Sequence, residues 1–417
     1  MDKLKITGNA SLNGSINISG AKNAALPIMV ASLLSENGLV LKNLPVLQDI
    51  STMKLLLESF GIKIKVVKSQ TYFNSTQIKN HTANYDLVRK MRASILVLGP
   101  LIARFKKAKI SLPGGCAIGT RPIDIHLNGL EKLGVTFSTE NGFIFGEVKK
   151  NLVGAIINLS FPSVGATENI MMAASLAEGK TIIENAAREP EIEDLARCLN
   201  NMGAKIVGTG TTQIRIEGVK SLTKTDHSII SDRIVAGTYV IAAIMLNNKF
   251  KINNIDPNLL LTPLKVLQNM GAKLDIGNDY IKVLPSDIIK GTKLETKPYP
   301  GFPTDLQAQM MALMSIANGQ SQIKEKIFEN RFMHVSELNR LGANIKIKND
   351  TAYIEGEKKL KGAPVMASDL RASVSLVLAG LCAEGETTIN RVYHLDRGYE
   401  KIEETLGKCG PKITRIK

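Results

Sequence analysis

Residues 57–64 read LESFGIKI, a helix end whose glycine leads into a strand, and five similar copies follow along the chain. These copies are LEKLGVTF (130–137), LNNMGAKI (199–206), LQNMGAKL (267–274), LNRLGANI (338–345) and LGKCGPKI (406–413). Their glycines, at 61, 134, 203, 271, 342 and 410, are 68 to 73 residues apart. Glycine suits a left-handed residue at a helix end because it lacks a Cβ atom. The sequence therefore predicts six repeats of about 70 residues.

Each repeat shows the pattern of a strand, a helix, a second strand, a second helix and a hairpin. Strand-like runs lie at 181–184, 249–252 and 387–389. Hairpin signals follow the glycines at Asn141-Gly142, Asn278-Asp279 and Asn349-Asp350. The sequence thus predicts an α/β fold of six βαβαββ units, which divide as three plus three.

Length and composition limit the class of protein. At 417 residues, 44% hydrophobic and 22% charged, the chain is predicted to form two soluble domains. It contains no apolar run of about 18 residues and no signal-peptide pattern at its start, so we expect a cytoplasmic protein with no membrane association. The four cysteines and five histidines are scattered, so we expect no disulfide, metal or cofactor.

The net charge of +15 raises the alternative of a non-catalytic polyanion-binding or RNA-binding repeat protein. However, the lysines are spread along the chain and are not interleaved with aromatic residues, which make up 5% of the sequence. A lysine-rich solvated surface is the first explanation of this charge and small anionic substrates are the next, and we expect no nucleic-acid partner.

Equivalent positions near the first helix of each repeat are polar or charged. These positions lie 37 to 42 residues before the repeat glycines and are Lys22, Arg92, Ser163, Asp232, Asp305 and Arg371. Near the second helices, Arg121, Arg331 and Arg397 lie 11 to 13 residues before a glycine. Helix N-termini bind anions, and arginine matches carboxylate and phosphate groups. We therefore expect the helix starts and the arginines to form a site for phosphorylated substrates.

An alternative explanation for the aspartates is that Asp232, Asp305 and Asp369 cap helices, each contributing about 1 kcal/mol. The case for anion binding rests instead on Lys22, Arg92 and Arg371. A basic residue at a helix N-terminus is unfavourable unless an anion compensates its charge.

A glycine-rich segment at 113–124, PGGCAIGTRPID, contains the candidate reactive thiol, Cys116. Three glycines allow close approach to a ligand, and neighbouring cationic groups lower a thiol pKa. Thr120 and Pro122 fit a helix start. Cys198, Cys382 and Cys409 lie in apolar helical patterns and are expected to be inert. His126 is more consistent with a packed helix residue than with a base.

Several longer motifs resemble the enolpyruvyl transferase family, specifically the UDP-N-acetylglucosamine 1-carboxyvinyltransferases. The motifs run from end to end and are SGAKNAALP (19–27), MRAS (91–94), LPGGCAIG (112–119) with Arg121-Pro122, ENAAREPE (184–191), FPTDLQAQ (302–309), FENRFMH (328–334) and YHLDRGY (393–399).

This resemblance implies a fold and a reaction. The fold would be two inside-out α/β barrel domains, one of residues 22–229 and one of residues 1–21 with 230–417, with the active site in the cleft between them. The reaction would transfer the enolpyruvyl group of phosphoenolpyruvate to the 3-hydroxyl of UDP-N-acetylglucosamine and release phosphate. It would need no metal, and it would begin the committed pathway of peptidoglycan synthesis.

The resemblance also implies roles for individual residues. Cys116 would protonate the vinyl carbon and would be alkylated by a phosphoenolpyruvate mimic such as fosfomycin. Asp305 would remove the proton of the sugar hydroxyl, and Lys22, Asn23, Arg121 and Arg397 would bind phosphoenolpyruvate. The UDP-sugar would be held by Arg92, Arg121, Pro122, Ile123, Asp124, Ile125, Ser163, Val164, Gly165 and Ile327. Arg331, Asp369 and Arg371 join the candidate binding residues through their places at helix starts.

Two departures from the family pattern concern the uridine side. Phe161-Pro162 precedes Ser163 where some members have a lysine, and Gln48 also stands where some relatives have lysine. The nearest alternative activity is enolpyruvyl transfer to shikimate 3-phosphate, whose enzymes lack the Pro-Gly-Gly-Cys segment.

Overall fold

The computed structural model describes residues 2–112 and 123–417. Their contacts divide the described chain into two compact units. The Lys22 unit comprises residues 20–112 and 123–230, and the Asp305 unit comprises residues 2–19 and 231–417. None of the described helices is both long and apolar enough to span a membrane.

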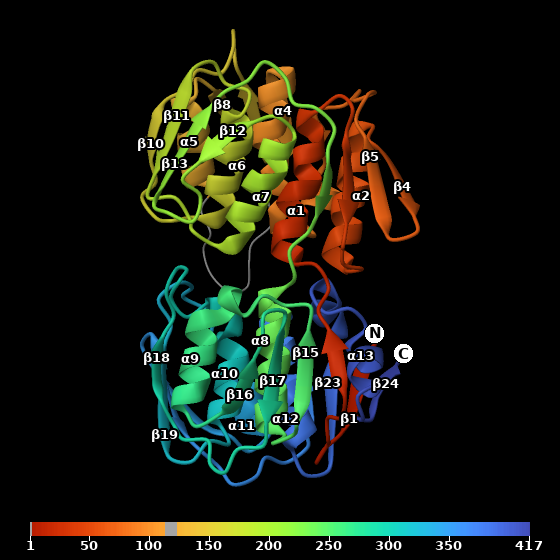
Figure 1. Cartoon of the computed structure of the whole chain (residues 1–417), viewed down its shortest axis with the longest axis vertical. Helices are drawn as coiled ribbons and strands as arrows, with labels where there is room; N and C mark the ends of the chain where they lie inside the picture. Colours follow the sequence, from red (N-terminus) through yellow and green to blue (C-terminus); the bar gives the residue numbers. More distant parts are fainter. Residues whose placement is uncertain (1, 113–122) are drawn as a thin grey trace. The chain divides into compact units, whose positions relative to one another are not determined.

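Each unit contains three four-stranded sheets in the described residues (Figure 1). The strands of the Lys22 unit are β3 (Leu39–Lys42), β4 (Lys63–Val67), β5 (Gln70–Asn74), β6 (Thr82–Ala83), β7 (Lys107–Ser111), β8 (Thr136–Glu140), β9 (Phe143–Glu147), β10 (Ile156–Asn158), β11 (Lys180–Glu184), β12 (Lys205–Val207), β13 (Gln213–Glu217) and β14 (Asp226–Ser228). Those of the Asp305 unit are β1 (Lys3–Thr7), β2 (Ser15–Asn17), β15 (Phe250–Asn253), β16 (Lys273–Ile276), β17 (Tyr280–Leu284), β18 (Lys293–Glu295), β19 (Gln320–Lys324), β20 (Asn344–Lys348), β21 (Thr351–Glu355), β22 (Pro364–Met366), β23 (Glu386–Asn390) and β24 (Ile413–Ile416).

All six sheets of the described residues share one pattern of parallel and antiparallel pairs, and five of them contain a hairpin, whereas in the sixth β1 pairs with β24 from the other end of the sequence. In the order β6-β7-β9-β8, for example, the first two strands are parallel, and the last two form a hairpin that pairs antiparallel with β7. The hairpins predicted at Asn141-Gly142, Asn278-Asp279 and Asn349-Asp350 are confirmed between β8 and β9, β16 and β17, and β20 and β21. The predicted strands at 181–184, 249–252 and 387–389 correspond to β11, β15 and β23, with ends that differ by one residue.

Three strands pair far from their sequence neighbours. The strand β14 pairs with β3, whereas β2 pairs with β15 about 235 residues further along the chain. The N-terminal strand β1 lies between β23 and β24 and completes the last sheet. The N-terminal segment therefore belongs to the Asp305 unit, although the residues that follow it belong to the Lys22 unit.

Long apolar helices form the interior of each unit, and the sheets lie around them (Figure 1). The interior helices are α1 (Lys22–Ala31), α4 (Leu98–Phe105), α6 (Val164–Ala174), α8 (Arg233–Met245), α10 (Gln307–Met314) and α12 (Leu370–Cys382). The second helices of the repeats are α2 (Gln48–Phe60), α5 (Asp124–Lys132), α7 (Pro190–Asn201), α9 (Leu261–Asn269), α11 (Val335–Arg340) and α13 (Ile402–Gly407). The short helices are α3 (Tyr85–Val88), η1 (Ser32–Leu34), η2 (Arg92–Val97), η3 (Pro257–Leu260), η4 (Thr304–Leu306) and η5 (Val392–Arg397).

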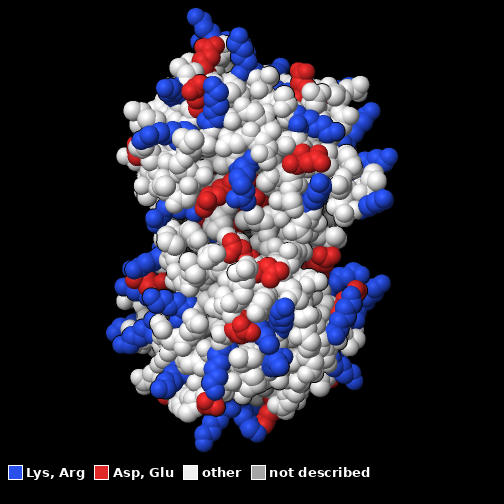
Figure 2. Space-filling model, viewed as in Figure 1, with Lys and Arg blue, Asp and Glu red and all other residues white. Residues whose placement is uncertain are grey.

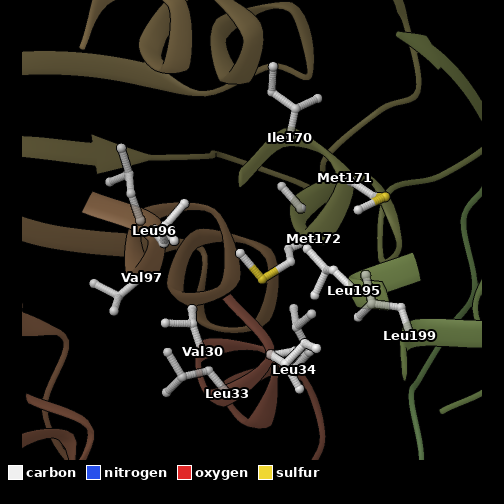
Figure 3. Packing of buried hydrophobic residues seen from close by; sticks show 14 of the residues in the cluster. Val30, Leu33, Leu34, Leu96, Val97, Ile170, Met171, Met172, Leu195 and Leu199 are labelled. Atoms are coloured by element: carbon white, nitrogen blue, oxygen red, sulfur yellow. The ribbon is translucent and has the colours of Figure 1, made fainter. Parts of the chain in front are cut away.

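The core of the Lys22 unit shows how these helices are held together. Leu33, Val97, Met172 and Leu195, from η1, η2, α6 and α7, are fully buried and cluster together (Figure 3). A helix that is apolar on all sides is stable only in such an interior. The polar starts of the interior helices are therefore fixed by a tightly packed core.

The six repeat glycines have the predicted conformation. All of them, at 61, 134, 203, 271, 342 and 410, have positive φ values between 92° and 119°. Gly203 has no heavy atom within 4 Å of the position that a Cβ would take, so its conformation alone favours glycine.

A matched pair of substitutions separates conformational strain from steric exclusion. At Gly203, alanine meets open space but an unfavourable φ, so we expect Gly203→Ala to cost about 1–2 kcal/mol of stability. At Gly356, a Cβ would lie 1.6 Å from the carbonyl oxygen of Ala317, so the backbone must move. We expect Gly356→Ala to cost about 3 kcal/mol. Denaturant unfolding of both variants measures these values, and equal losses would contradict the steric argument.

Candidate active site

Two arginines hold the Asp305 carboxylate in the Asp305 unit. Asp305 Oδ1 accepts a hydrogen bond from Arg331 Nη2 at 2.8 Å, and Asp305 Oδ2 accepts one from Arg371 Nη2 at 2.9 Å. The side chains of Arg331 and Arg371 are 4% and 6% exposed, whereas that of Asp305 is 27% exposed. The arginines are therefore fixed in the interior, while the carboxylate remains accessible to a ligand. Burial is the largest single effect on the pKa of Arg371 and lowers it, but the charge and hydrogen bond of Asp305, together with the charges of Tyr399 and Asp232, raise this pKa overall.

The structure separates the helix-start aspartates that the sequence could not separate. Asp232 Oδ1 caps α8 by accepting from the backbone N–H groups of Ile234 and Val235. Asp369 Oδ1 caps α12 in the same way, by accepting from Arg371 and Ala372. Among the described residues, the carboxylate of Asp305 accepts no hydrogen bond from the backbone at the start of η4, and it is bound by the two arginines. Capping therefore explains Asp232 and Asp369 but not Asp305.

Arg397 and Ile327 lie in other parts of the same unit. Arg397 ends η5, and together with burial its charge lowers the pKa of His394. Burial also lowers the pKa of His334 to about 4, against the opposing charge of Asp369. The backbone N–H of Ile327 donates to Glu325 Oε1 at 2.8 Å.

In the Lys22 unit, α1 begins at Lys22, whose Nζ lies 3.4 Å from Asp49 Oδ2 on α2. Asp49 is 3% exposed, so a protein carboxylate supplies a compensating negative charge at this helix start. Asn23 is the second residue of α1, and Arg92 begins η2. Sequence reasoning missed Asp49, although an aspartate in the first turn of the next helix is a visible signal.

The segment around His126 meets the start of α6. Ser163 Oγ caps α6 by accepting from Ala166 N at 3.3 Å, and Val164 and Gly165 form the first turn. Gly165 packs against the His126 ring, where a Cβ would lie 3.1 Å from Cε1. Ile123 and Ile125 are half-buried, and Asp124 begins α5. Several predicted residues of the UDP-sugar group therefore lie close together.

His126 is a packed residue, as the sequence indicated. Its Nδ1 lies 3.2 Å from Asn169 Nδ2, and Asn169 also binds the backbone of Ile95 and Gly99. Burial, together with the charge of Arg92, lowers the pKa of His126 to about 4. The imidazole is therefore neutral near pH 7 and accepts a hydrogen bond from the Asn169 amide.

Three of the predicted residues, Cys116, Arg121 and Pro122, lie outside the described residues, as does Thr120. The other cysteines are unreactive by their surroundings. Burial raises the pKa values of Cys198 and Cys409. It also raises the pKa of Cys382, to about 12. Neutral thiols of this kind are poor nucleophiles. Within the described residues, no group of three His, Cys, Asp or Glu side chains could hold a metal ion.

Sequence reasoning also missed a buried carboxyl group on α6. Glu168 is 3% exposed, and its Oε1 has no hydrogen-bond partner among the described residues. Burial raises its pKa well above the ordinary value, and the charges of Glu191 and Glu189 add to this effect. The signal in the sequence was a single acidic residue inside the apolar run of α6.

This raised pKa predicts how stability depends on pH. The folded state retains a proton on Glu168 that the unfolded chain loses above the ordinary carboxyl pKa, so stability falls as pH rises through the raised folded pKa. The slope in this range is at most about 1.4 kcal/mol per pH unit. We expect Glu168→Gln to remove this loss, so that the free energy of unfolding of the variant rises relative to that of the wild type between pH 5 and pH 8. Denaturant unfolding measures the gain, with Glu140→Gln on an exposed strand as the control. Parallel pH profiles would contradict the prediction.

The surface charge is dispersed over the faces that Figure 2 shows. Lys and Arg side chains are scattered across both units, with Asp and Glu side chains among them. A polyanion-binding protein typically gathers its basic residues into a patch or stripe. The visible faces therefore favour the small-substrate explanation of the net charge.

Comparison with known proteins defines the class. A family model described as EPSP synthase (3-phosphoshikimate 1-carboxyvinyltransferase) matches residues 6–406. Among solved structures, the enolpyruvyl transferase NikO from Streptomyces tendae aligns with a TM-score of 0.90 at 23% identity, covering 99% of this chain and 98% of that one. An EPSP synthase from Acinetobacter baumannii aligns over the full length of both chains with a TM-score of 0.78 at 17% identity. The fold is thus that of the enolpyruvyl transferases.

More similar relatives identify the family. The UDP-N-acetylglucosamine 1-carboxyvinyltransferases of Granulibacter bethesdensis and Pelagibacter ubique are each 54% identical over 418 residues, and the alignments cover all of both chains. The chain belongs to the UDP-N-acetylglucosamine 1-carboxyvinyltransferase family.

Proposed function

We propose that this protein transfers the enolpyruvyl group of phosphoenolpyruvate to the 3-hydroxyl of UDP-N-acetylglucosamine, with release of phosphate, as a step of peptidoglycan synthesis. The observation on which this rests is the 54% identity over the whole length of relatives with this activity in their name. The Asp305 carboxylate, exposed yet held by two buried arginines, supports the same chemistry.

The reaction requires two balanced steps. In the addition, O3 of the sugar bonds to C2 of phosphoenolpyruvate, the hydroxyl loses its proton, and C3 gains one. In the elimination, C2 loses phosphate and C3 loses a proton, which restores the double bond. A positioned acid or base contributes on the order of 10²–10⁴ to such a proton transfer.

Residues of both units have proposed roles in these steps. Cys116 delivers the proton to C3, and Asp305 accepts the proton of the sugar hydroxyl. Lys22, Asn23, Arg121 and Arg397 bind phosphoenolpyruvate, and their charges stabilise the anionic groups. The UDP-sugar is bound by Arg92, by residues 121–125 and 163–165, and by the backbone of Ile327. Arg331, Asp369 and Arg371 complete the proposed binding set around Asp305.

Two further proposals concern the architecture and location. We propose that each unit is an inside-out α/β barrel of three βαβαββ repeats, since interior helices and surrounding sheets recur in both. The domain boundaries proposed from sequence lie near residues 21 and 230. The reaction is proposed to take place in the cytoplasm, where phosphoenolpyruvate is formed.

Phosphate release from purified protein tests the function. We expect release with phosphoenolpyruvate and UDP-N-acetylglucosamine, and none above background when shikimate 3-phosphate replaces the UDP-sugar. Release only with shikimate 3-phosphate would establish the alternative activity. No release with either acceptor would refute the proposal.

A further inference from the structure

A buried hydrogen-bond network lies beneath the candidate site in the Asp305 unit. It joins Tyr399, Thr238 on α8 and Gln309 on α10, which are 1%, 0% and 0% exposed. Tyr399 OH lies 2.8 Å from Thr238 Oγ1, and Gln309 Nε2 lies 3.0 Å from the same oxygen. No residue of this network was among the candidates from the sequence.

The donors and acceptors of the network can be assigned. The hydroxyl proton of Thr238 is donated to the carbonyl oxygen of Ile234 at 2.8 Å. Thr238 Oγ1 must therefore accept from Tyr399 OH and from Gln309 Nε2. Gln309 donates its other amide proton to the carbonyl oxygen of Asp305 at 3.0 Å. A directed chain of hydrogen bonds thus runs from α8 to the backbone of Asp305.

Tyr399 also follows Arg397 by two residues. The N–H groups of Gly398 and Tyr399 both donate to the carbonyl oxygen of Leu395, which fixes this turn on η5. Gly398 packs so closely on α12 that a Cβ would lie 2.7 Å from Leu370 Cδ2. Burial raises the pKa of Tyr399, and the charge of Arg371, the next residue of α12, partly opposes this rise. The Tyr399 side chain therefore connects the turn that follows Arg397 with the helix starts at which Asp305 and Arg371 lie.

We propose that Tyr399 is a positioning residue, whose hydroxyl fixes Asp305 and the Arg397 segment relative to one another through Thr238 and Gln309. The inference rests on the proposed function for its kinetic consequence. The hydrogen bonds of the network hold its three side chains in place, although Gln309 Oε1 has no partner among the described residues. A displacement of about 1 Å in a site can cost 10²-fold in rate. The structural part of the inference stands apart from any activity.

Tyr399→Phe tests the proposal, because it removes only the hydroxyl. We expect kcat to fall about tenfold, with the KM for UDP-N-acetylglucosamine within about threefold of the wild type. Tyr239→Phe is the matched control, since Tyr239 is also buried on α8 but does not bind this network among the described residues. We expect the control to keep wild-type kcat. A Tyr399→Phe enzyme with kcat within twofold of the wild type would overturn the proposal.

Variants of Thr238 separate positioning from a general loss of packing. Thr238→Val removes the shared acceptor and is expected to reproduce the loss of Tyr399→Phe, whereas Thr238→Ser keeps the hydroxyl and is expected to retain kcat within about twofold. The double variant Tyr399→Phe/Thr238→Val should be no slower than the slower single variant, because both changes break one chain. Fully additive losses would contradict a shared network.

Hydrogen exchange provides a readout that does not depend on turnover. In Tyr399→Phe, the amides of Leu306 and Gly398 should exchange faster than in the wild type, and in Tyr239→Phe they should not. Unchanged exchange at both amides would overturn the proposal even if activity fell. If wild-type protein releases no phosphate, the proposed function fails, while this exchange experiment still decides the positioning role.

Discussion

An Asp305→Asn variant should lose phosphate release by a factor on the order of 10²–10⁴, because asparagine cannot accept the proton of the sugar hydroxyl. Asparagine keeps the shape of the side chain, whereas alanine would also leave two buried guanidinium groups without an acceptor at this position. Asparagine is neutral, so both variants break the ion pairs, which can destabilise a protein by about 3–5 kcal/mol, but asparagine keeps one acceptor oxygen for the guanidinium groups and alanine keeps none. Steady-state phosphate release well below the melting temperature measures the loss.

The matched control is Asp232→Asn, at the equivalent helix start of α8. Asp232 caps its helix through Oδ1, and asparagine caps as well as aspartate. We expect this control to keep turnover within a few-fold of the wild type. The proposed role of Asp305 would be wrong if both variants lost activity equally, or if Asp305→Asn kept turnover within threefold.

A Cys116→Ala variant should lose both turnover, by a factor on the order of 10²–10⁴, and alkylation by fosfomycin. In the expected labelling, the thiolate opens the epoxide with a new S–C bond, and the released alkoxide takes up a proton. The prediction rests on the position of Cys116 among glycines and cationic residues of the sequence, which favours a reactive thiolate. Intact-mass measurement before and after incubation with the epoxide detects the adduct.

A partly buried thiol, that of Cys382, supplies the control for this experiment. Burial raises the pKa of Cys382 to about 12, so its neutral thiol should not react. We therefore expect Cys382→Ala to be labelled as completely as the wild type. An adduct that persists in Cys116→Ala would show that another cysteine is the reactive one.

Local signals in the sequence predicted the repeat, because its physical cause is local. The positive φ of Gly203 favours glycine whatever the helix packs against, because no neighbouring atom restricts this position. A hairpin such as that at Asn141-Gly142 likewise forms between residues that are close in sequence. The pairing of β2 with β15 and of β14 with β3 could not be predicted in this way. The strands of such a pair lie far apart in sequence, and no short motif specifies the partner of a three-residue strand.

The candidate site was predictable to a similar extent. Sequence spacing placed Asp305 and Arg371 at equivalent helix starts, but not the ion pair between them, which depends on how α10 packs against α12. Capping of α12 by Asp369 was one of two open explanations, and only the hydrogen bonds decide it. Tyr399 lay within a quoted motif, yet its role depends on burial against Thr238, which no spacing reveals.

The place of β1 between β23 and β24 has a consequence for synthesis on the ribosome. The first nineteen residues emerge first, but the partners of β1 are among the last to be made. The Lys22 unit can complete its sheets once β14 has emerged, while the N-terminal strands wait unpaired. Nascent chains stalled far enough beyond β14 for this strand to have left the ribosome should therefore protect the Lys22 unit from protease and leave the N-terminal segment open to cleavage.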